Sequence, residues 1–287
     1  MEAPPVLIAV EAPPVLPRTG LPAWRWAAML ALLAAYPLIL GLLAEVLGRF
    51  GVKETSGSTT LLPDTTGELL VTCGENFGVF AVLFGIAYAF GRPSMDDLWA
   101  RWRRPWTTLG LGAAWSIGLR ALVAGLVTCV AVALIIWQKI HGGEAASLDA
   151  FRPKIENLIS PAALHDPVYL FTTLTLVSFV VAGLREELWR AGMMAAFGKL
   201  LPARWRNRWG QAASIVFAAV IFGLGHLPQG AAGVVLTGVL GLGLGWVMTF
   251  HRSLWVAVLA HGFFDATSFA GLWALERSGL LKQLIPG

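Results

Sequence analysis

Three short stretches place acidic, basic and histidine side chains inside long apolar runs: 185–192, 222–226 and 261–265. A charged residue at the centre of a bilayer costs about 3 kcal/mol on insertion scales, so such residues face the protein interior and mark candidate functional sites. Carboxylates and imidazoles together can activate a water molecule and stabilise developing negative charge. The sequence therefore offers the side chains that a hydrolytic reaction needs.

Helical spacing pairs specific side chains within each stretch. Residues three or four apart lie on one face of a helix, so Arg190 can pair with either Glu186 or Glu187. The other two stretches each contain an i, i+4 pair, which are Phe222 with His226 and His261 with Asp265. Taken singly, each pair also fits a structural role, because a lone histidine in an apolar helix is more often a packing residue than a catalyst.

The low charge of the chain points to a lipid bilayer as its surroundings. Of its 287 residues, 56% are hydrophobic and 13% are charged, whereas soluble domains carry about 25% charged residues. The formal net charge is +4, but Lys and Arg sit in short loops between apolar runs. That distribution is typical of membrane insertion and argues against a nucleic-acid partner.

The apolar runs predict an all-α, polytopic transmembrane helix bundle with seven to eight spans. A membrane-spanning helix needs about 20 mostly apolar residues. The expected spans are 26–44, 69–91, 106–138, 168–198, 210–227, 230–250 and 253–275. The third is long enough to be one tilted helix or a broken pair. Basic loops between spans two and three and between spans four and five place the N-terminus in the cytoplasm.

The length of the fourth span decides whether the polar residues can meet. Its apolar part ends at Leu184, but a helix that continues to about Gly198 has the full length of a span. At 1.5 Å per residue, Glu186 then lies about 20 Å from the inner surface, His226 about 25 Å and His261 about 14 Å. Only the long helix brings these three side chains close to one depth.

Other polar residues within the spans carry weaker signals. Cys73 and Cys129 are isolated, so they indicate neither a disulfide framework nor a zinc site. Glu75, Asn76 and Arg120 also fall inside expected spans. They either line the same cavity or form a buried polar cluster, and we favour a structural role for them.

Taken together, the three stretches resemble the CAAX prenyl endopeptidase and bacteriocin-processing (CPBP) family of intramembrane glutamate-type proteases. The family motifs EExxxR, FxxxH and HxxxN or HxxxD follow one another on successive helices, and they are matched here by Glu186 and Glu187, by Phe222 and His226, and by His261 and Asp265. The resemblance covers about 168–275. One residue departs from the pattern, because Ala191 takes the arginine place and Arg190 sits one residue early.

The resemblance implies an intramembrane endopeptidase that hydrolyses a peptide bond with glutamate-activated water. The catalytic residues that it implies are Glu186, Glu187, His226, His261 and Asp265, with Arg190 and Phe222 in support. Glu186 would be the general base, His226 would help to hold the water, and His261 would donate to the oxyanion. The early position of Arg190 leaves open which glutamate is the base. Asp265 is either protonated or orients His261, and its spacing favours the second role.

Several alternatives remain at this stage. No cofactor is expected, although Glu186, His226 and His261 could in principle bind zinc; the sequence lacks HExxH and GxSxG. A non-catalytic immunity or scaffold membrane protein of the same fold is the main alternative. A transporter is a third possibility, against which the absence of a clear repeat between the two halves counts. The expected partners are the lipid bilayer and a peptide or membrane-protein substrate, prenylated or not.

Composition and the resemblance together predict three parts of the chain. We expect residues 1–20 to be a flexible Pro-rich N-terminal tail, in which EAPPVL occurs twice, residues 21–166 to be N-terminal transmembrane helices and loops, and residues 167–287 to be a CPBP-like catalytic transmembrane core. The compact chain and its simple loops fit a bacterial member. We therefore expect an integral protein of the bacterial inner membrane.

Overall fold

The computed structural model describes residues 20–49, 60–141 and 157–281, and most of the chain within these ranges is helical. The long helices are α1 (Ala23–Arg49), α2 (Thr66–Gly91), α3 (Pro105–His141), α4 (Pro167–Thr172), η4 (Thr173–Glu186), α5 (Glu187–Leu200), α6 (Arg208–Leu224), α7 (Gly230–His251) and α8 (Leu254–Arg277). Short 3-10 turns lie at η3 (Pro161–His165), η5 (Ala203–Trp205) and η6 (Leu227–Gln229). The Pro-rich tail predicted at the N-terminus falls outside the described residues up to position 19.

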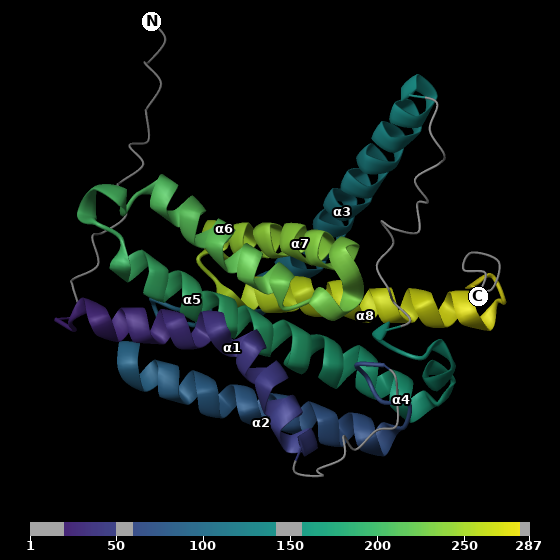
Figure 1. The fold of residues 1–287 in the computed structure, drawn as a ribbon, viewed down its shortest axis with the longest axis horizontal. Helices are drawn as coiled ribbons and strands as arrows, with labels where there is room; N and C mark the ends of the chain where they lie inside the picture. Colours follow the sequence, from purple (N-terminus) through teal and green to yellow (C-terminus); the bar gives the residue numbers. More distant parts are fainter. Residues whose placement is uncertain (1–19, 50–59, 142–156, 282–287) are drawn as a thin grey trace, which may run out of the picture.

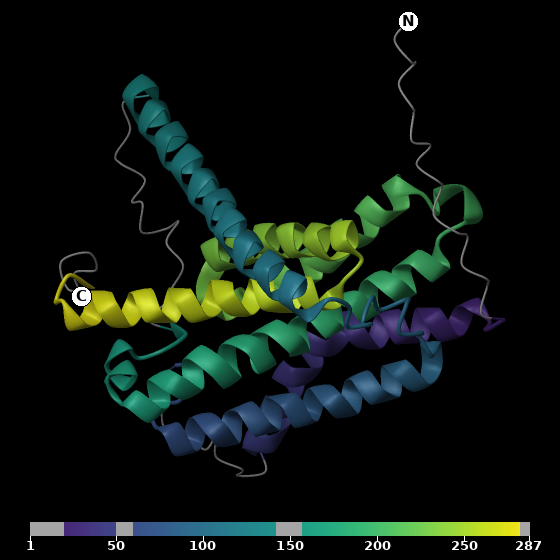
Figure 2. The ribbon, with the colours of Figure 1, turned by 180° about the vertical axis from the view of Figure 1, so that it is seen from behind.

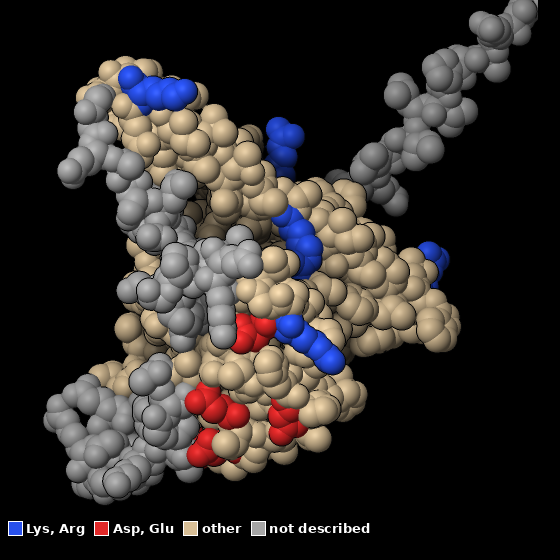
Figure 3. All heavy atoms as spheres, turned by 90° about the vertical axis from the view of Figure 1, so that its right-hand side faces the viewer, with Lys and Arg blue, Asp and Glu red and all other residues tan. Residues whose placement is uncertain are grey.

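The described helices confirm a polytopic transmembrane bundle. When α4, η4 and α5 are counted as one continuous helix, six of the described helices are long and apolar enough to cross a membrane. The remaining helix, α6, is apolar but shorter. Charged side chains form only a few separate groups on the face shown in Figure 3, among a wide area of uncharged residues. A surface of this kind suits hydrocarbon rather than water. The protein is therefore an integral membrane protein with roughly seven spans.

The third span is one unbroken helix. α3 has 37 residues, which corresponds to about 55 Å of helix, well above the hydrocarbon thickness of about 30 Å. Its N-terminal part packs against α8 and α7, and its C-terminal part projects away from the other helices in Figures 1 and 2. Of the two possibilities for this span, the structure shows the single helix.

The fourth span continues through the two glutamates, as the depth comparison predicts. It begins where the Asp166 carboxylate accepts hydrogen bonds from the backbone N–H groups of Val168 and Tyr169, at 2.7 and 3.2 Å, a typical N-cap. Pro167 follows at the first helical position, where its missing N–H costs nothing. The helix then runs through α4, η4 and α5 to Leu200. The stretch η4 is π-helical, a conformation often found at functional sites.

Glycine allows the fourth span to approach α8 closely. A Cβ atom at Gly183 of η4 would lie 2.9 Å from the carbonyl oxygen of Val258 in α8, and one at Gly262 of α8 would collide with the Phe179 ring. Small residues permit such close backbone contact between membrane helices. This packing brings η4 against α8, and Figures 1 and 2 show the fourth span running alongside α8.

The sixth helix ends earlier than the sequence pattern predicts. The expected span of 210–227 includes His226, but α6 stops at Leu224. Its end is followed by a turn in which the His226 N–H donates to the Gly223 carbonyl oxygen at 2.9 Å. Pro228 follows shortly and cannot continue an α-helix. His226 therefore lies in the turn after α6, where it is half-buried, and not inside the helix.

The loop between α2 and α3 is tied to the end of α5 by an ion pair. The Asp97 carboxylate lies 2.7 Å from Lys199 Nζ and is almost fully buried, and it also accepts hydrogen bonds from Ser94. Although burial by itself raises the pKa of the Asp97 carboxyl, these contacts outweigh it and hold the pKa below its ordinary value. The ion pair therefore contributes its full stabilisation above about pH 4, the pKa of an unfolded Asp. This contribution is lost as the pH falls through the lower pKa that Asp97 has in the folded protein.

We expect Asp97→Asn to lower the free energy of unfolding by about 1–3 kcal/mol at neutral pH, because it weakens a charged hydrogen bond in a buried setting. The neighbouring Asp96→Asn is the control, since its pair with Arg101 is exposed and should contribute little. Thermal unfolding in detergent at pH 7 and pH 3 measures both variants. The gap between Asp97→Asn and wild type should narrow at pH 3; equal losses in the two variants would contradict the assignment.

Candidate active site

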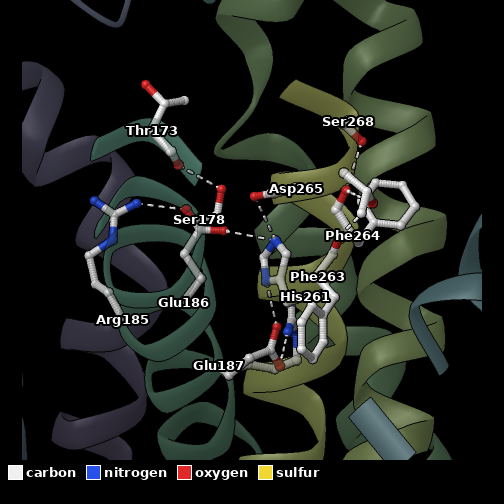
Figure 4. A network of polar contacts seen from close by, with 12 residues as sticks. Thr173, Ser178, Arg185, Glu186, Glu187, His261, Phe263, Phe264, Asp265 and Ser268 are labelled. Carbon is white, nitrogen blue, oxygen red and sulfur yellow. Dashed lines mark hydrogen bonds and ion pairs between the residues drawn. The ribbon is translucent and has the colours of Figure 1, made fainter. Parts of the chain in front are cut away.

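Glu186 is the last residue of η4 and points toward His261 of the neighbouring helix α8, as Figure 4 shows. Its Oε2 atom lies 3.9 Å from Nε2 of His261, and its Oε1 accepts a hydrogen bond from the Arg185 guanidinium at 2.6 Å. The side chain keeps 13% exposure, so it is not completely enclosed by the protein. Tyr36 of α1 lies close to the same guanidinium. The sequence reading assigned no role to Arg185.

Glu187, the next residue, has contacts to both of its carboxylate oxygens. It is fully buried, and its Oε2 forms an ion pair with the equally buried Arg190. The Arg190 guanidinium also lies over the Phe222 ring of α6, 4.3 Å from the ring centroid. Helical spacing allowed Arg190 to pair with either Glu186 or Glu187, and in the structure it pairs with Glu187. The early position of the arginine fits this choice, because residues three apart share a helix face.

His261 joins both glutamates to Asp265. Its Nδ1 lies 2.9 Å from Oε1 of Glu187, and because a carboxylate can only accept, Nδ1 carries the hydrogen. Its Nε2 lies 3.6 Å from Oδ2 of Asp265, the i, i+4 contact that the spacing predicts. Asp265 keeps 24% exposure. Glu187 therefore fixes the ring orientation and leaves Nε2 directed toward Glu186 and the accessible side.

His226 approaches the same place from the turn after α6. Its ring packs edge-on against Phe222 with centroids 4.7 Å apart, and Phe222 in turn lies 6.1 Å from the His261 ring. Its Nδ1 lies 2.8 Å from the Phe222 carbonyl oxygen. Because that oxygen can only accept, Nδ1 donates, and Nε2 has no hydrogen-bond partner among the residues that the structure describes. His226 also lies within electrostatic range of Glu186.

The remaining intramembrane polar residues do not form one cluster. Glu75 is exposed on α2, and Asn76 donates to the Thr72 carbonyl oxygen of its own helix at 2.9 Å. The prediction that these two join Arg120 in a shared cavity or cluster is therefore wrong. Of these three residues, only Arg120 contacts α8, the helix that carries His261 and Asp265. It donates hydrogen bonds there to the Phe264 carbonyl oxygen and to Thr267.

A metal centre is not apparent in the part of the chain that the structure describes. No three His, Cys, Asp or Glu side chains there are grouped so that they could hold a metal ion. Glu186, His226 and His261, which the sequence left as candidate zinc ligands, all lie in that part of the chain. Oε1 of Glu187 and Nδ1 of His261 contact each other. These two atoms are therefore not available as ligands for a shared metal ion.

Comparison with known proteins connects this site to a protease family. Residues 168–267 match the model of the family described as type II CAAX prenyl endopeptidase Rce1-like, which confirms the resemblance that the three motifs indicate. The matched segment runs from α4 to the middle of α8 and contains every candidate catalytic residue named above. No curated protein and no solved structure matches the chain.

Proposed function

We propose, from this match and from the geometry of the site, that the protein is an intramembrane endopeptidase in which Glu186 activates the attacking water. One observation carries the proposal. Of the two adjacent glutamates, only Glu186 is partly exposed, and no basic nitrogen among the described residues lies closer than 3.9 Å to its Oε2, whereas Glu187 uses both oxygens on Arg190 and His261. A base must have a free oxygen within reach of the proton that it abstracts.

The 3.9 Å between Glu186 and Nε2 of His261 supports this role. It exceeds a direct hydrogen bond, and a separation of this size is one that a water molecule can bridge. Because Nδ1 of His226 is used in its contact with the Phe222 carbonyl oxygen, its Nε2 can provide a second contact for that water. In the proposal, water bound between these groups is the nucleophile.

The reaction then follows without further residues. Glu186 takes a proton from the water, and the hydroxide adds to the carbonyl carbon of the scissile peptide bond. The carbonyl oxygen becomes an oxyanion, which accepts a hydrogen bond from Nε2–H of a doubly protonated His261. When the C–N bond breaks, the leaving amine takes the proton from Glu186. Asp265 holds His261 by its contact at Nε2 until substrate arrives, and no step is routed through a metal.

The substrate in this proposal is a peptide or membrane protein that presents its cleavage site within the bilayer. The site lies between membrane helices and retains limited exposure at Glu186 and Asp265, so an extended segment fits better than a folded domain. We also propose that the N-terminus is cytoplasmic, because the basic residues of the 92–104 and 201–208 loops then face the cytoplasm.

Cleavage by the purified protein tests the proposal. The wild type in detergent should cleave a membrane peptide from a set of candidate substrates, and His226→Ala should lower kcat about 100-fold, because it removes a group that positions the attacking water. His141→Ala is the matched control, since His141 is exposed at the far end of α3. A wild type that binds peptides but never cleaves them would favour the non-catalytic scaffold instead.

A further inference from the structure

The charges of the candidate site can be paired, and one acid is left without a contacting arginine. Glu186 pairs with Arg185 and Glu187 pairs with Arg190. Asp265 is the third carboxylate, and its only contact with a basic group among the described residues is His261. If His261 is to serve the oxyanion, a second positive charge near Asp265 is needed, because an uncompensated carboxylate between membrane helices is costly.

Arg120 of α3 is the arginine placed to supply that charge. It donates hydrogen bonds to the Phe264 carbonyl oxygen and to the Thr267 hydroxyl, and it reaches Ser268 Oγ at 3.3 Å. These contacts hold it against the helical turn that carries Asp265. Its guanidinium also lies over the Phe264 ring at 4.6 Å. The guanidinium is within electrostatic range of Asp265 without touching it.

The backbone packing explains why Arg120 reaches this position. α3 and α8 are in close contact, and a Cβ atom at Gly112 would collide with Leu259 of α8. The absence of a side chain at Gly112 therefore lets the two helices approach, and Arg120 lies two turns further along α3. An arginine inside an apolar span is rare and is a candidate functional residue by default.

We propose that Arg120 is a positioning residue of the active site, which is held by the turn that carries Asp265 and acts through Asp265 by balancing its charge. This inference rests on the proposed protease function, because the role assigned to Asp265 is to hold His261. It extends the site to α3, a helix outside the segment that matches the family model. The arginine at 120 would thus offset the negative charge that an aspartate introduces at 265, where an asparagine would be neutral.

A double-mutant cycle separates charge balance from simple packing. Arg120→Gln should lower kcat about tenfold with little change in KM, because it weakens transition-state stabilisation rather than binding. In the Asp265→Asn background, which lacks the negative charge, the same change should alter kcat by less than about twofold. Equal losses in both backgrounds would overturn the proposal and leave Arg120 as an anchor of α8 only.

Two further variants serve as controls. Arg120→Lys keeps the charge and loses the planar fork, so it should restore most of the activity; a lysine as poor as glutamine would overturn the role of charge. Thr267→Val removes one hydrogen-bond partner of Arg120 and keeps the charge, so kcat should stay near the wild-type value.

A second measurement keeps the inference independent of proteolysis. The same cycle is read as the thermal unfolding midpoint in detergent. Arg120→Gln should lower the midpoint more in the wild type than in Asp265→Asn, because only the wild type leaves an unbalanced carboxylate. If the protein cleaves no peptide but this coupling is present, the proposed function fails and the pairing stands. If cleavage occurs without any coupling, the pairing fails alone.

Discussion

Glu186→Gln should reduce kcat for peptide cleavage by about 1,000-fold or more, because glutamine cannot take a proton from water while a general base contributes up to about 10⁴-fold. The change is nearly isosteric, and the amide oxygen can still accept the hydrogen bond that Arg185 donates to Oε1. Glu186 is also partly exposed. The fold should therefore be preserved, which circular dichroism and the unfolding midpoint in detergent will show.

Glu186→Asp is the informative partner of that variant. Aspartate keeps the carboxylate but withdraws it by one methylene, so activity should be low yet measurable. Full activity in Glu186→Gln would move the base to another residue, and Glu187 would be the first to test. Loss of both activity and folding in Glu186→Gln, with Glu186→Asp still folded, would instead assign the carboxylate a structural role beside Arg185.

The meeting of Glu186 with His261 was predictable from the sequence, because it depends on local quantities. A constant rise per residue and the length of an apolar run fix the depth of each side chain in the membrane. The contact of His261 with Asp265 was predictable for the same reason, as it lies within one helical turn. The family motifs added the order of the helices but no geometry.

Other features of the site depend on information that spacing does not contain. Residues one apart do not face each other on an α-helix, so the Arg185–Glu186 pair was not expected; it forms at the end of the π-helical stretch η4. The turn at His226 was hidden by apolar residues that continue to Leu227, although Pro228 was a readable stop signal. Arg120 reaches α8 from 144 residues away in the sequence, a contact that only the packed bundle defines.

Arg190→Met should destabilise the protein by about 3–5 kcal/mol, the cost of breaking a buried ion pair by removal of one partner. Both members of the pair are fully buried, so the Glu187 carboxylate would be left uncompensated between membrane helices. The loss of the contact with the Phe222 ring adds to the effect. The unfolding midpoint in detergent and the yield of monodisperse protein measure it. A midpoint within a degree of the wild type would show that Glu187 is balanced by another group.

Replacing both partners separates stability from activity at this pair. Glu187→Leu combined with Arg190→Met removes both charges and fills the space, and such exchanges are often neutral or stabilising. The double variant should therefore regain most of the stability that Arg190→Met loses. It should still be inactive, because Nδ1 of His261 loses the carboxylate that it contacts at 2.9 Å, and a ring without that partner is no longer held with Nε2 toward Glu186. Recovery of cleavage together with stability would show that Glu187 and Arg190 only hold the helices, and that His261 is oriented by Asp265 alone.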